Sequence, residues 1–330
     1  MGAYEQSSAL TVVTTAADVV DANDGVISLR EALANASEGD TITFSPTLAG
    51  QTLVVTSELL IEKSVNIDGE GNNITLSGGG AVRVLRFYGV ETDVYTVSNL
   101  TITDGSSTHG AGVYVSAGKA SIVNCAVVGN NSTTSGGGIY VAGKGELSAT
   151  NVLVAENSAK YGGGIYSYGG VDKSVVLTNC TITSNSATSS GSGLHTESGN
   201  GTLELRNTIV ALNTGNADVQ KKTSSRVVLV QNTLSSFTGW ASGSAANLVY
   251  SASQPLFVGS GDYRLADGSQ AIDRGDASYI SERFDLSGAP RVVGGSVDLG
   301  AYESSSALSH VALDAAFAEL DFDDASFFDI

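Results

Sequence analysis

Apolar residues recur at fixed distances from a series of asparagines in the middle of the chain. The series has a spacing of 25 to 28 residues and consists of Asn99, Asn124, Asn151, Asn179 and Asn207. At the positions two before, one after and three after each asparagine, fourteen of the fifteen residues are apolar. Such alternation predicts short strands with one buried face, and asparagine tolerates the left-handed backbone that a tight corner needs. We expect these asparagines to form a structural ladder of corner residues.

A glycine-rich phrase recurs in the same region and ends each time in a ring. Its four copies are His109-Gly-Ala-Gly-Val-Tyr114, Gly136-Gly-Gly-Ile-Tyr140, Gly162-Gly-Gly-Ile-Tyr166 and Gly191-Ser-Gly-Leu-His195. The last residues lie 26, 26 and 29 positions apart, in step with the asparagines. This period predicts an all-β fold, the coils of a parallel β-helix stacked about 4.8 Å apart. A leucine-rich repeat has a similar period but would show a Leu/Asn consensus, which is absent here. A β-sandwich would not keep the asparagines, the rings and the aliphatic residues at one common period.

The two cysteines test the predicted coil register. Cys125 and Cys180 occupy the same ladder position two coils apart, one residue after a corner asparagine. Two coils separate their Cα atoms by about 9–10 Å, which exceeds the limit of about 7 Å for a disulfide. We therefore expect two free, buried thiols.

The two ends of the chain differ from its repetitive middle. Ser28-Leu29-Arg30-Glu31 has the pattern of a capping box, which predicts a short amphipathic helix. Such a helix would cover the first coil, since an uncapped β-helix exposes its core. We divide the chain into a junction from a preceding tandem unit (1–10), an N-terminal cap (11–50), the β-helix coils (51–246), C-terminal coils and a cap (247–303), and an acidic tail (304–330).

A nine-residue phrase brackets the chain. Gly2–Leu10 reads GAYEQSSAL and Gly300–Leu308 reads GAYESSSAL, which agree at eight of nine positions. Internal repetition produces such brackets. We therefore expect a unit of a longer tandem protein, to which Met1 was added. Neighbouring tandem units and copies of this chain are then the first expected partners.

Composition and charge limit the other partners. Acids outnumber bases 34 to 16, which gives a net charge of -18. We expect no nucleic-acid partner, because phosphate binding needs clustered Lys and Arg. No apolar run approaches the roughly 20 residues that span a bilayer, so no membrane span is expected. Residues 109–216 carry five acids and five bases, which leaves the acidic surplus near the ends.

Carboxylates near both ends are candidate calcium ligands, since Ca²⁺ prefers carboxylate and carbonyl oxygens. The candidates are Asp18, Asp21, Asn23 and Asp24 at one end, and Asp273, Asp276, Asp285 and Asp298 at the other. The alternative is that these side chains cap turns. The sequence requires no cofactor, and Ca²⁺ is the one ion that it suggests.

The rings that end the glycine-rich phrases form a candidate binding surface. Alternation places the preceding aliphatic residue inward and the ring outward, so an exposed stripe is expected at Tyr114, Tyr140, Tyr166 and His195, with Tyr168 beside it. Exposed aromatic stripes stack on sugar rings or anchor partners, which makes surface glycans a second class of partner. The alternative is that the rings only stack on one another.

An enzymatic role would need two carboxylates on one face of neighbouring coils. The acids of the shaft are Glu146, Glu156, Asp172, Glu197 and Glu204, and no acid recurs at one ladder position. Asp104 and His109 are the acid and imidazole that we consider as a pair in this region. A loop histidine beside a corner aspartate explains them equally well, so we expect no catalytic residues.

Three segments resemble known families of bacterial surface proteins. Residues 18–44 resemble the CSLREA domain, with Ile27 in place of the cysteine in its name. The GGGIY and NSA phrases are similar to repeats of polymorphic outer membrane proteins. Residues 247–303 resemble the choice-of-anchor Q domain. The resemblance implies a right-handed, single-stranded parallel β-helix, a pectin-lyase-like solenoid, in a secreted or surface-exposed protein.

The sequence thus predicts a non-catalytic, extracellular or cell-surface β-helix module of a large repetitive protein. It would act as a structural stalk, an adhesin or a self-associating filament unit. The alternative is a polysaccharide-acting enzyme or a carbohydrate-binding module of the same fold.

Overall fold

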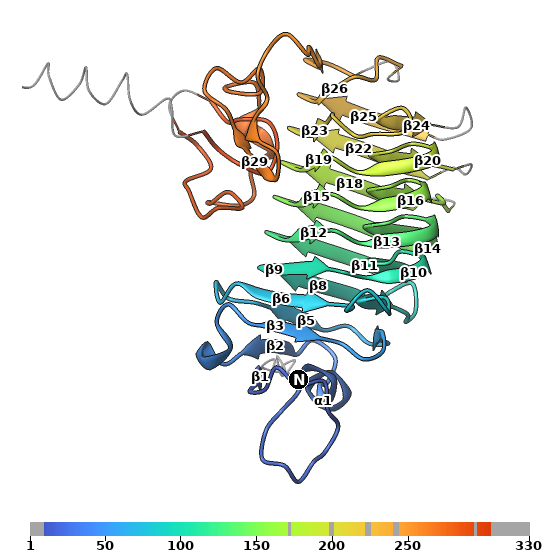
Figure 1. Cartoon of the computed structure of the whole chain (residues 1–330), viewed down its shortest axis with the longest axis vertical. Helices are drawn as coiled ribbons and strands as arrows, with labels where there is room; N and C mark the ends of the chain where they lie inside the picture. The colour runs from blue at the N-terminus through green and yellow to red at the C-terminus, as the bar shows by residue number, and fades with distance from the viewer. Residues whose placement is uncertain are drawn as a thin grey trace, which may run out of the picture.

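The chain folds as a parallel β-helix, which confirms the predicted fold class. The computed structural model describes residues 10–170, 173–197, 201–221, 226–239, 244–293 and 296–304. Short strands stack in about eight turns to form a shaft, with a helix at one end and a looser segment along one side (Figure 1). The predicted junction, except Leu10, and the predicted acidic tail, except Ser304, lie outside the described residues.

The first sheet has fourteen strands in two parallel columns, which share β11 and β14. One column consists of β4 (Leu59–Ile61), β7 (Leu85–Phe87), β11 (Val113–Val123), β14 (Ile139–Thr150), β17 (Ile165–Ser167), β21 (Leu194–Thr196) and β24 (Val219–Lys221). The other adds β1 (Leu10–Val13), β2 (Thr41–Phe44), β5 (Asn66–Asp68), β8 (Val94–Ser98), β18 (Ser174–Thr178), β22 (Thr202–Arg206) and β25 (Arg226–Gln231).

Two further parallel sheets close the shaft. The second sheet consists of β3 (Thr52–Val54), β6 (Ile74–Ser77), β9 (Leu100–Thr103), β12 (Ala126–Val128), β15 (Leu153–Ala155), β19 (Thr181–Thr183), β23 (Ile209–Val210), β26 (Leu234–Ser235) and β27 (Leu248–Val249). The third sheet consists of β10 (Ser106–His109), β13 (Asn131–Ser135), β16 (Ser158–Tyr161) and β20 (Ser186–Ser190). An antiparallel hairpin outside the shaft pairs β28 (Phe257–Gly259) with β29 (Asp262–Leu265).

One coil visits the three sheets in turn, as the chain from β11 to β14 shows. Asn124 turns β11 of the first sheet into β12 of the second, and Gly129 turns β12 into β13 of the third. A glycine-rich turn then leads into β14, which lies in parallel register on β11. At this turn a Cβ on Gly137 would lie 2.4 Å from the Gly163 carbonyl oxygen, so only glycine allows the backbones to approach this closely.

The apolar positions of the repeat form one continuous core. All fifteen positions flanking the corner asparagines are buried, including Thr208, the polar one. Cys125 and Cys180 are free and buried, as predicted. The thiol of Cys180 donates to the carbonyls of Ala149 and Thr178, and the hydroxyl of Thr208 donates to those of Leu177 and Arg206 in the next coil. Threonine can take the position of cysteine because its hydroxyl donates to the equivalent two carbonyl groups of its own coil and the preceding coil.

The corner asparagines adopt the left-handed conformation that the sequence predicted. The φ angles of Asn99, Asn124, Asn151, Asn179 and Asn207 lie between 48° and 58°. The second corner of the four coils from β12 to β23 differs, because the left-handed residue there comes just before an asparagine, as Glu156 (φ 59°) precedes Asn157. The side chain of Asn157 points inward and is fully buried.

These inward asparagines form a second, buried ladder. Each Nδ2 donates to the Oδ1 of the next member at 2.9 Å, from Asn130 through Asn157 and Asn185 to Asn213, and Asn213 donates to Asp218. The same amides donate to carbonyls of the preceding coil. Because a buried amide is costly unless it is bonded, this ladder holds neighbouring coils at one spacing.

The N-terminal helix forms as predicted. Helix α1 (Leu29–Asn35) starts with a complete capping box, in which Ser28 accepts from the Glu31 amide and Glu31 accepts from the Ser28 amide. Leu29, Ala32 and Leu33 are buried in the main core. The helix therefore covers the first coil, at the bottom of Figure 1. A short 3-10 turn, η1 (Pro46–Leu48), follows β2.

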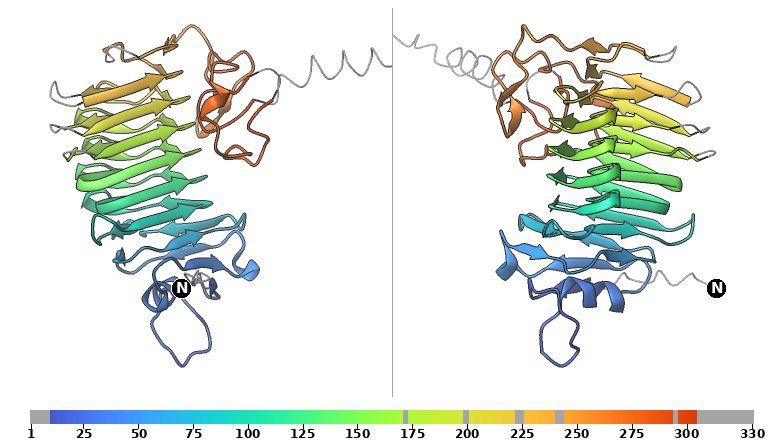
Figure 2. Two further views of the ribbon diagram at one scale, coloured as in Figure 1. Left: turned by 180° about the vertical axis from the view of Figure 1, so that it is seen from behind. Right: turned by 45° about the vertical axis from the view of Figure 1, so that its right-hand side comes forward.

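The C-terminal cap lies elsewhere than expected. After β27 the chain folds back along the outer face of the second sheet, so residues 250–304, here called the lateral segment, lie beside the shaft (Figure 2). The segment contains β28, β29 and the 3-10 turn η2 (Ala277–Tyr279). Both faces of β15 and β19 are therefore buried. The outward residues of these strands offered apolar surface that the lateral segment covers.

Candidate functional site

The predicted aromatic ladder forms, at consecutive positions of the first sheet. Tyr114, Tyr140, Tyr166 and His195 pair in register on β11, β14, β17 and β21. The ring centroids of Tyr140 and Tyr166 lie 5.2 Å apart with planes at 4°, and those of Tyr166 and His195 lie 4.9 Å apart at 16°. Tyr114 meets Tyr140 edge on at 5.0 Å. The rings thus stack on one another along the shaft.

The ladder is more buried than the sequence predicted. A second ladder on the third sheet (His109, Ser135, Tyr161 and Ser190) faces it across the glycine-rich turn. Tyr161 packs edge on against His195 at 5.9 Å. Tyr166 is 7% exposed and His195 is 5% exposed, so the expectation of an exposed stripe is wrong for these two residues. Tyr168 is 49% exposed, as expected.

Burial also sets the ionisation of the stacked rings. Desolvation, and then neighbouring tyrosines, raise the pKa of Tyr140 and of Tyr166 to about 12. Both hydroxyls therefore stay protonated at neutral pH. Burial lowers the pKa of His109, and the nearby Arg83 lowers it further, so this imidazole is neutral there.

His195 closes the ladder and is held on both ring nitrogens. Its Nδ1 lies 2.8 Å from Ser190 Oγ and its Nε2 lies 3.0 Å from Glu197 Oε2. The Tyr166 hydroxyl donates to the same Glu197 oxygen at 3.1 Å. Ser, His and Glu are the residue types of a nucleophilic relay, but this imidazole is buried between the Tyr166 and Tyr161 rings. The geometry orients the ring as the end of a stack.

The acid-imidazole pair considered from the sequence, Asp104 and His109, does not come together. Asp104 accepts a hydrogen bond from Ser77 Oγ, whereas His109 packs edge on against Tyr140. Proximity in sequence was misleading here because the left-handed corner at Asp104 turns the chain into β10.

Two arginines extend the aromatic ladder toward the N-terminal end. The guanidinium carbon of Arg83 lies 4.9 Å from the centre of the Tyr114 ring, and that of Arg86 lies 5.4 Å from it. Arg86 also lies over Tyr88, at 4.7 Å. Both arginines pair with Glu58. Cation–π contact thus continues the stack where the tyrosines end.

The N-terminal candidate calcium ligands stabilise turns. Asp18 pairs with Arg30 at 2.9 Å and accepts from Thr56. Burial alone would raise the pKa of Asp18, but these hydrogen bonds outweigh it and leave the pKa below its ordinary value. Asp21 accepts from the Asn23 amide, and Asp24 accepts from the Val26 amide. The described contacts are those of a capped loop.

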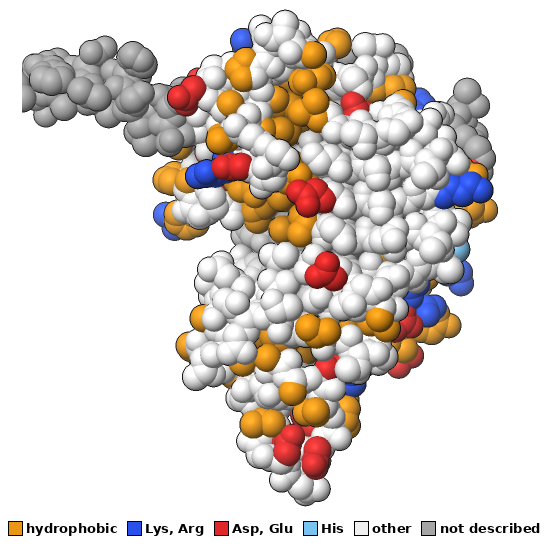
Figure 3. Space-filling model, in the orientation of Figure 1, with side chains coloured by type: hydrophobic (Ala, Val, Ile, Leu, Met, Phe, Trp, Pro, Cys, Tyr) orange, Lys and Arg blue, Asp and Glu red, His pale blue; other side chains and the backbone are white. Residues whose placement is uncertain are grey.

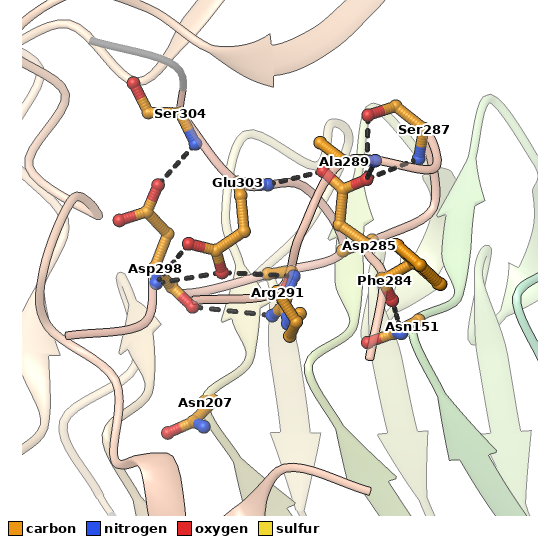
Figure 4. Close-up of polar contacts among 12 residues, drawn as sticks. Asn151, Asn207, Phe284, Asp285, Ser287, Ala289, Arg291, Asp298, Glu303 and Ser304 are labelled. Carbon is orange, nitrogen blue, oxygen red and sulfur yellow. Dashed lines mark hydrogen bonds and ion pairs between the residues drawn. The ribbon is translucent and has the colours of Figure 1, made fainter. Parts of the chain in front are cut away.

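Two of the C-terminal candidates surround an arginine side chain. Arg291 is 1% exposed and lies among Asp285, Asp298 and Glu303 (Figure 4). Its Nη1 lies 3.4 Å from Glu303 Oε1, and its Nη2 donates to the Gly300 carbonyl. The cation at this cluster is thus a guanidinium, which the sequence analysis missed. The sequence did contain a sign of this cluster, because Arg291 is the single arginine among the acidic residues of 285–303.

The other two C-terminal candidates have structural contacts. Asp276 caps η2 through the Ser278 amide, and the Asp273 amide donates to Asp298. Throughout the described part of the chain, no group of three or more His, Cys, Asp or Glu side chains is placed to hold a metal ion. Calcium binding stays a prediction without a formed site.

One guanidinium cannot neutralise three buried carboxylates. Desolvation, with Asp298 and Asp285 nearby, raises the pKa of Glu303 to about 8 despite Arg291. Desolvation also raises the pKa of Asp298. The cluster therefore holds a proton on a carboxyl group at neutral pH.

The corner asparagines have a role beyond their backbone conformation. Asn207 accepts from the Asp276 amide at 2.8 Å and donates to the Asp276 carbonyl at 2.9 Å. Asn151 donates to the Phe284 carbonyl at 2.8 Å, and Asn232 donates to the Arg274 carbonyl at 2.9 Å. The predicted structural ladder thus also fixes the lateral segment to the shaft.

A groove remains between the lateral segment and the part of the second sheet that it leaves open. One cavity of about 610 Å³ lies between the corner at Asn99 and Asn124 and the loop 284–288. A second, of about 370 Å³, lies toward Glu156 and β29. Figure 3 shows apolar side chains gathered where the lateral segment meets the shaft.

Comparison with known proteins supports the fold alone. No protein-family model matches the chain, and no curated protein does. The crystal structure of pectate lyase Pel9A matches it with a TM-score of 0.50 and 14% sequence identity, over 90% of this chain and 97% of that one. No helix in the described residues has the length and apolar character needed to cross a membrane. The chain is thus a right-handed parallel β-helix of the kind found in that lyase.

Proposed function

We propose that the chain is a non-catalytic β-helix module of a large repetitive protein on a bacterial surface, where it acts as a stalk or adhesive unit. One observation carries the proposal: the histidine and carboxylate side chains that could take part in catalysis contact other side chains of the fold instead. The imidazole of His195 is buried in a ring stack, and the carboxylates around Arg291 hold loops of the lateral segment to one another. Both sets stabilise the fold.

The location outside the cell rests on the resemblance of residues 18–44 and 247–303 to segments of surface proteins. The near-identical phrases Gly2–Leu10 and Gly300–Leu308 support tandem units as partners. The described ladders of hydrogen bonds and rings need no cofactor for their formation. A regular shaft with internally bonded ladders is well suited to hold a fixed length between other parts of a protein.

An assay of polysaccharide cleavage tests the non-catalytic role. The full chain is incubated with neutral and acidic polysaccharides, with EDTA and then with millimolar calcium, and new reducing ends and unsaturated products are measured. We expect neither product to exceed a protein-free control. Product formation that is lost in His195→Gln or Glu197→Gln, with an unchanged melting temperature, would support the enzyme instead.

Light scattering after size exclusion tests association with copies of the chain. An average mass that rises with protein concentration would support the self-associating unit, and a constant monomer mass would contradict it.

Melting curves of the same samples in EDTA and in calcium test the metal prediction. Since the described residues form no cluster that could hold an ion, we expect equal melting temperatures.

A further inference from the structure

The groove beside the lateral segment contains two adjoining cavities. Its two cavities share Thr101 and Ala126 as a floor and Tyr302 as a wall. Thr101 and Ala126 are neighbours in register on β9 and β12, so the floor is flat and lined by small side chains. The groove runs from the asparagine corners before β6, β9 and β12 to the corner at Glu156 after β15, so it crosses the strands obliquely.

The wall of the groove is fixed in place. The Gly300 amide donates to the Asn207 carbonyl, and the Ala301 amide donates to Thr181 Oγ1 at 2.9 Å. On the other side of Tyr302, Glu303 pairs with Arg291. The Tyr302 ring is therefore held over the floor before any ligand binds, which lowers the cost of binding.

Three polar groups on the groove are available to a ligand. The Tyr302 hydroxyl, the Thr101 hydroxyl and the Asn124 Nδ2 have no hydrogen-bond partner among the described residues, whereas Asn124 Oδ1 already accepts from Asn151. Phe284, which is 52% exposed, adds an apolar ring at one end. Rings with a few convergent hydroxyl and amide groups are what a sugar chain needs, because its faces are apolar and its edges are hydroxyls.

The groove excludes two other kinds of ligand. A peptide cannot add as a strand, because β9 and β12 are paired on both sides, with β6 and β15 as outer neighbours. An anionic chain would meet the exposed Glu156 at one end, and the nearby Arg264 already pairs with Asp262. For the same reason the acidic residues 305–330 are a poor occupant.

We propose that this groove binds a neutral oligosaccharide, laid obliquely across β9 and β12 of the second sheet beneath Tyr302. The inference goes beyond the structural role proposed above and does not depend on it. No bond is made or broken in the binding step.

Titration calorimetry of the full chain with cellohexaose, xylohexaose and mannohexaose tests the inference, with hexagalacturonate as the anionic comparison. Thr101→Arg fills the floor, Tyr302→Phe removes one hydroxyl, and Ser121→Arg makes the same kind of change on the outward side of the first sheet. Melting curves check that each variant folds.

We expect at least one neutral hexasaccharide to bind, with affinity lowered about tenfold or more by Thr101→Arg, lowered less by Tyr302→Phe and unchanged by Ser121→Arg. Lack of binding by all three neutral sugars, tighter binding of hexagalacturonate, or equal binding by Thr101→Arg would overturn the inference. Binding that emerges only in a chain truncated after Ser304 would also overturn it, because residues 305–330 would then be the occupant. Any of these results leaves the structural role standing.

Discussion

Single residues at the coil corners decide how tightly the chain can turn. The second corner of successive coils is occupied by Gly129, Glu156, Ser184 and Leu212, all with φ between 54° and 66°. Glycine adopts this conformation freely, whereas a side chain with a Cβ makes it costly. The corner is thus the same in shape but unequal in strain from coil to coil.

Leu212→Gly should therefore stabilise the protein, and Gly129→Ala should destabilise it. Leu212 is 41% exposed, so little packing is lost when it is replaced. We expect changes in the free energy of unfolding of about 0.5–1 kcal/mol, with opposite signs. Urea unfolding of both variants measures them, and a loss of stability in Leu212→Gly would contradict the strain.

The ionisation of Glu303 gives a second prediction at this scale. Its pKa in the folded state, about 8, lies above its ordinary value of 4.5. Folding therefore favours the protonated carboxyl, whose stabilising effect is complete below the ordinary pKa and is lost as the pH rises through 8. We expect Glu303→Gln to weaken the fall in melting temperature between about pH 5 and about pH 9.

The exposed Glu38 provides the matched control for this experiment. Glu38→Gln makes the same chemical change away from the cluster and should keep the slope of the unmodified chain. Equal slopes in the two variants would show that Glu303 is ionised in the fold at neutral pH.

At the scale of elements, ladders of side chains stabilise the shaft more than any individual strand does. Most strands have only three to five residues, too few for independent stability. Asparagine amides and aromatic rings, repeated in register, connect each strand to the next along the shaft. The aromatic ladder therefore stabilises β11, β14, β17 and β21 as one unit.

Removing a central ring should show this dependence. Tyr140 contacts the rings of His109, Tyr114 and Tyr166. We expect Tyr140→Ala to lower the free energy of unfolding by about 2–4 kcal/mol. Tyr168→Ala, at a 49% exposed ring, should change it by less than about 0.5 kcal/mol. Thermal melts compare the two, and similar losses would contradict a stabilising stack.

At the scale of the whole molecule, the lateral segment divides the second sheet into a covered and an open part. Both faces of β19 are buried, whereas alternate residues of β9 stay partly exposed beside the groove. Every one of these strands is paired on both sides. Because the two strands differ in burial and not in pairing, we expect β19 to be locally more stable than β9.

Hydrogen exchange can measure this difference directly. Amides of β19 should exchange more slowly than those of β9, because opening β19 also exposes the interface with the lateral segment. Peptides from each strand, followed by mass spectrometry, give the two rates. Equal protection would show that the segment adds no stability to the coils it covers.

The sequence predicted the features that follow from a repeat or a local pattern, and it missed those that depend on contacts between distant parts of the chain. The ladders, the corner asparagines, the free cysteines and helix α1 each follow from a local pattern or a fixed period. The burial of Tyr166 and His195 depends on the third sheet, which turns back over the rings. The lateral position of residues 250–304 depends on contacts such as Tyr263 with Glu156, 107 residues apart, which no local pattern encodes.

The attachment of the lateral segment also decides where a pull on the chain would act. Ser304 follows Gly300 and Ala301, which are bonded to Asn207 and Thr181 on the side of the shaft. Tension applied at Ser304 would therefore enter the shaft beside β19 and β23, across several bonds strained together. The coils beyond, up to β27, would bear none of it until those bonds failed, so the shaft would resist peeling from its end.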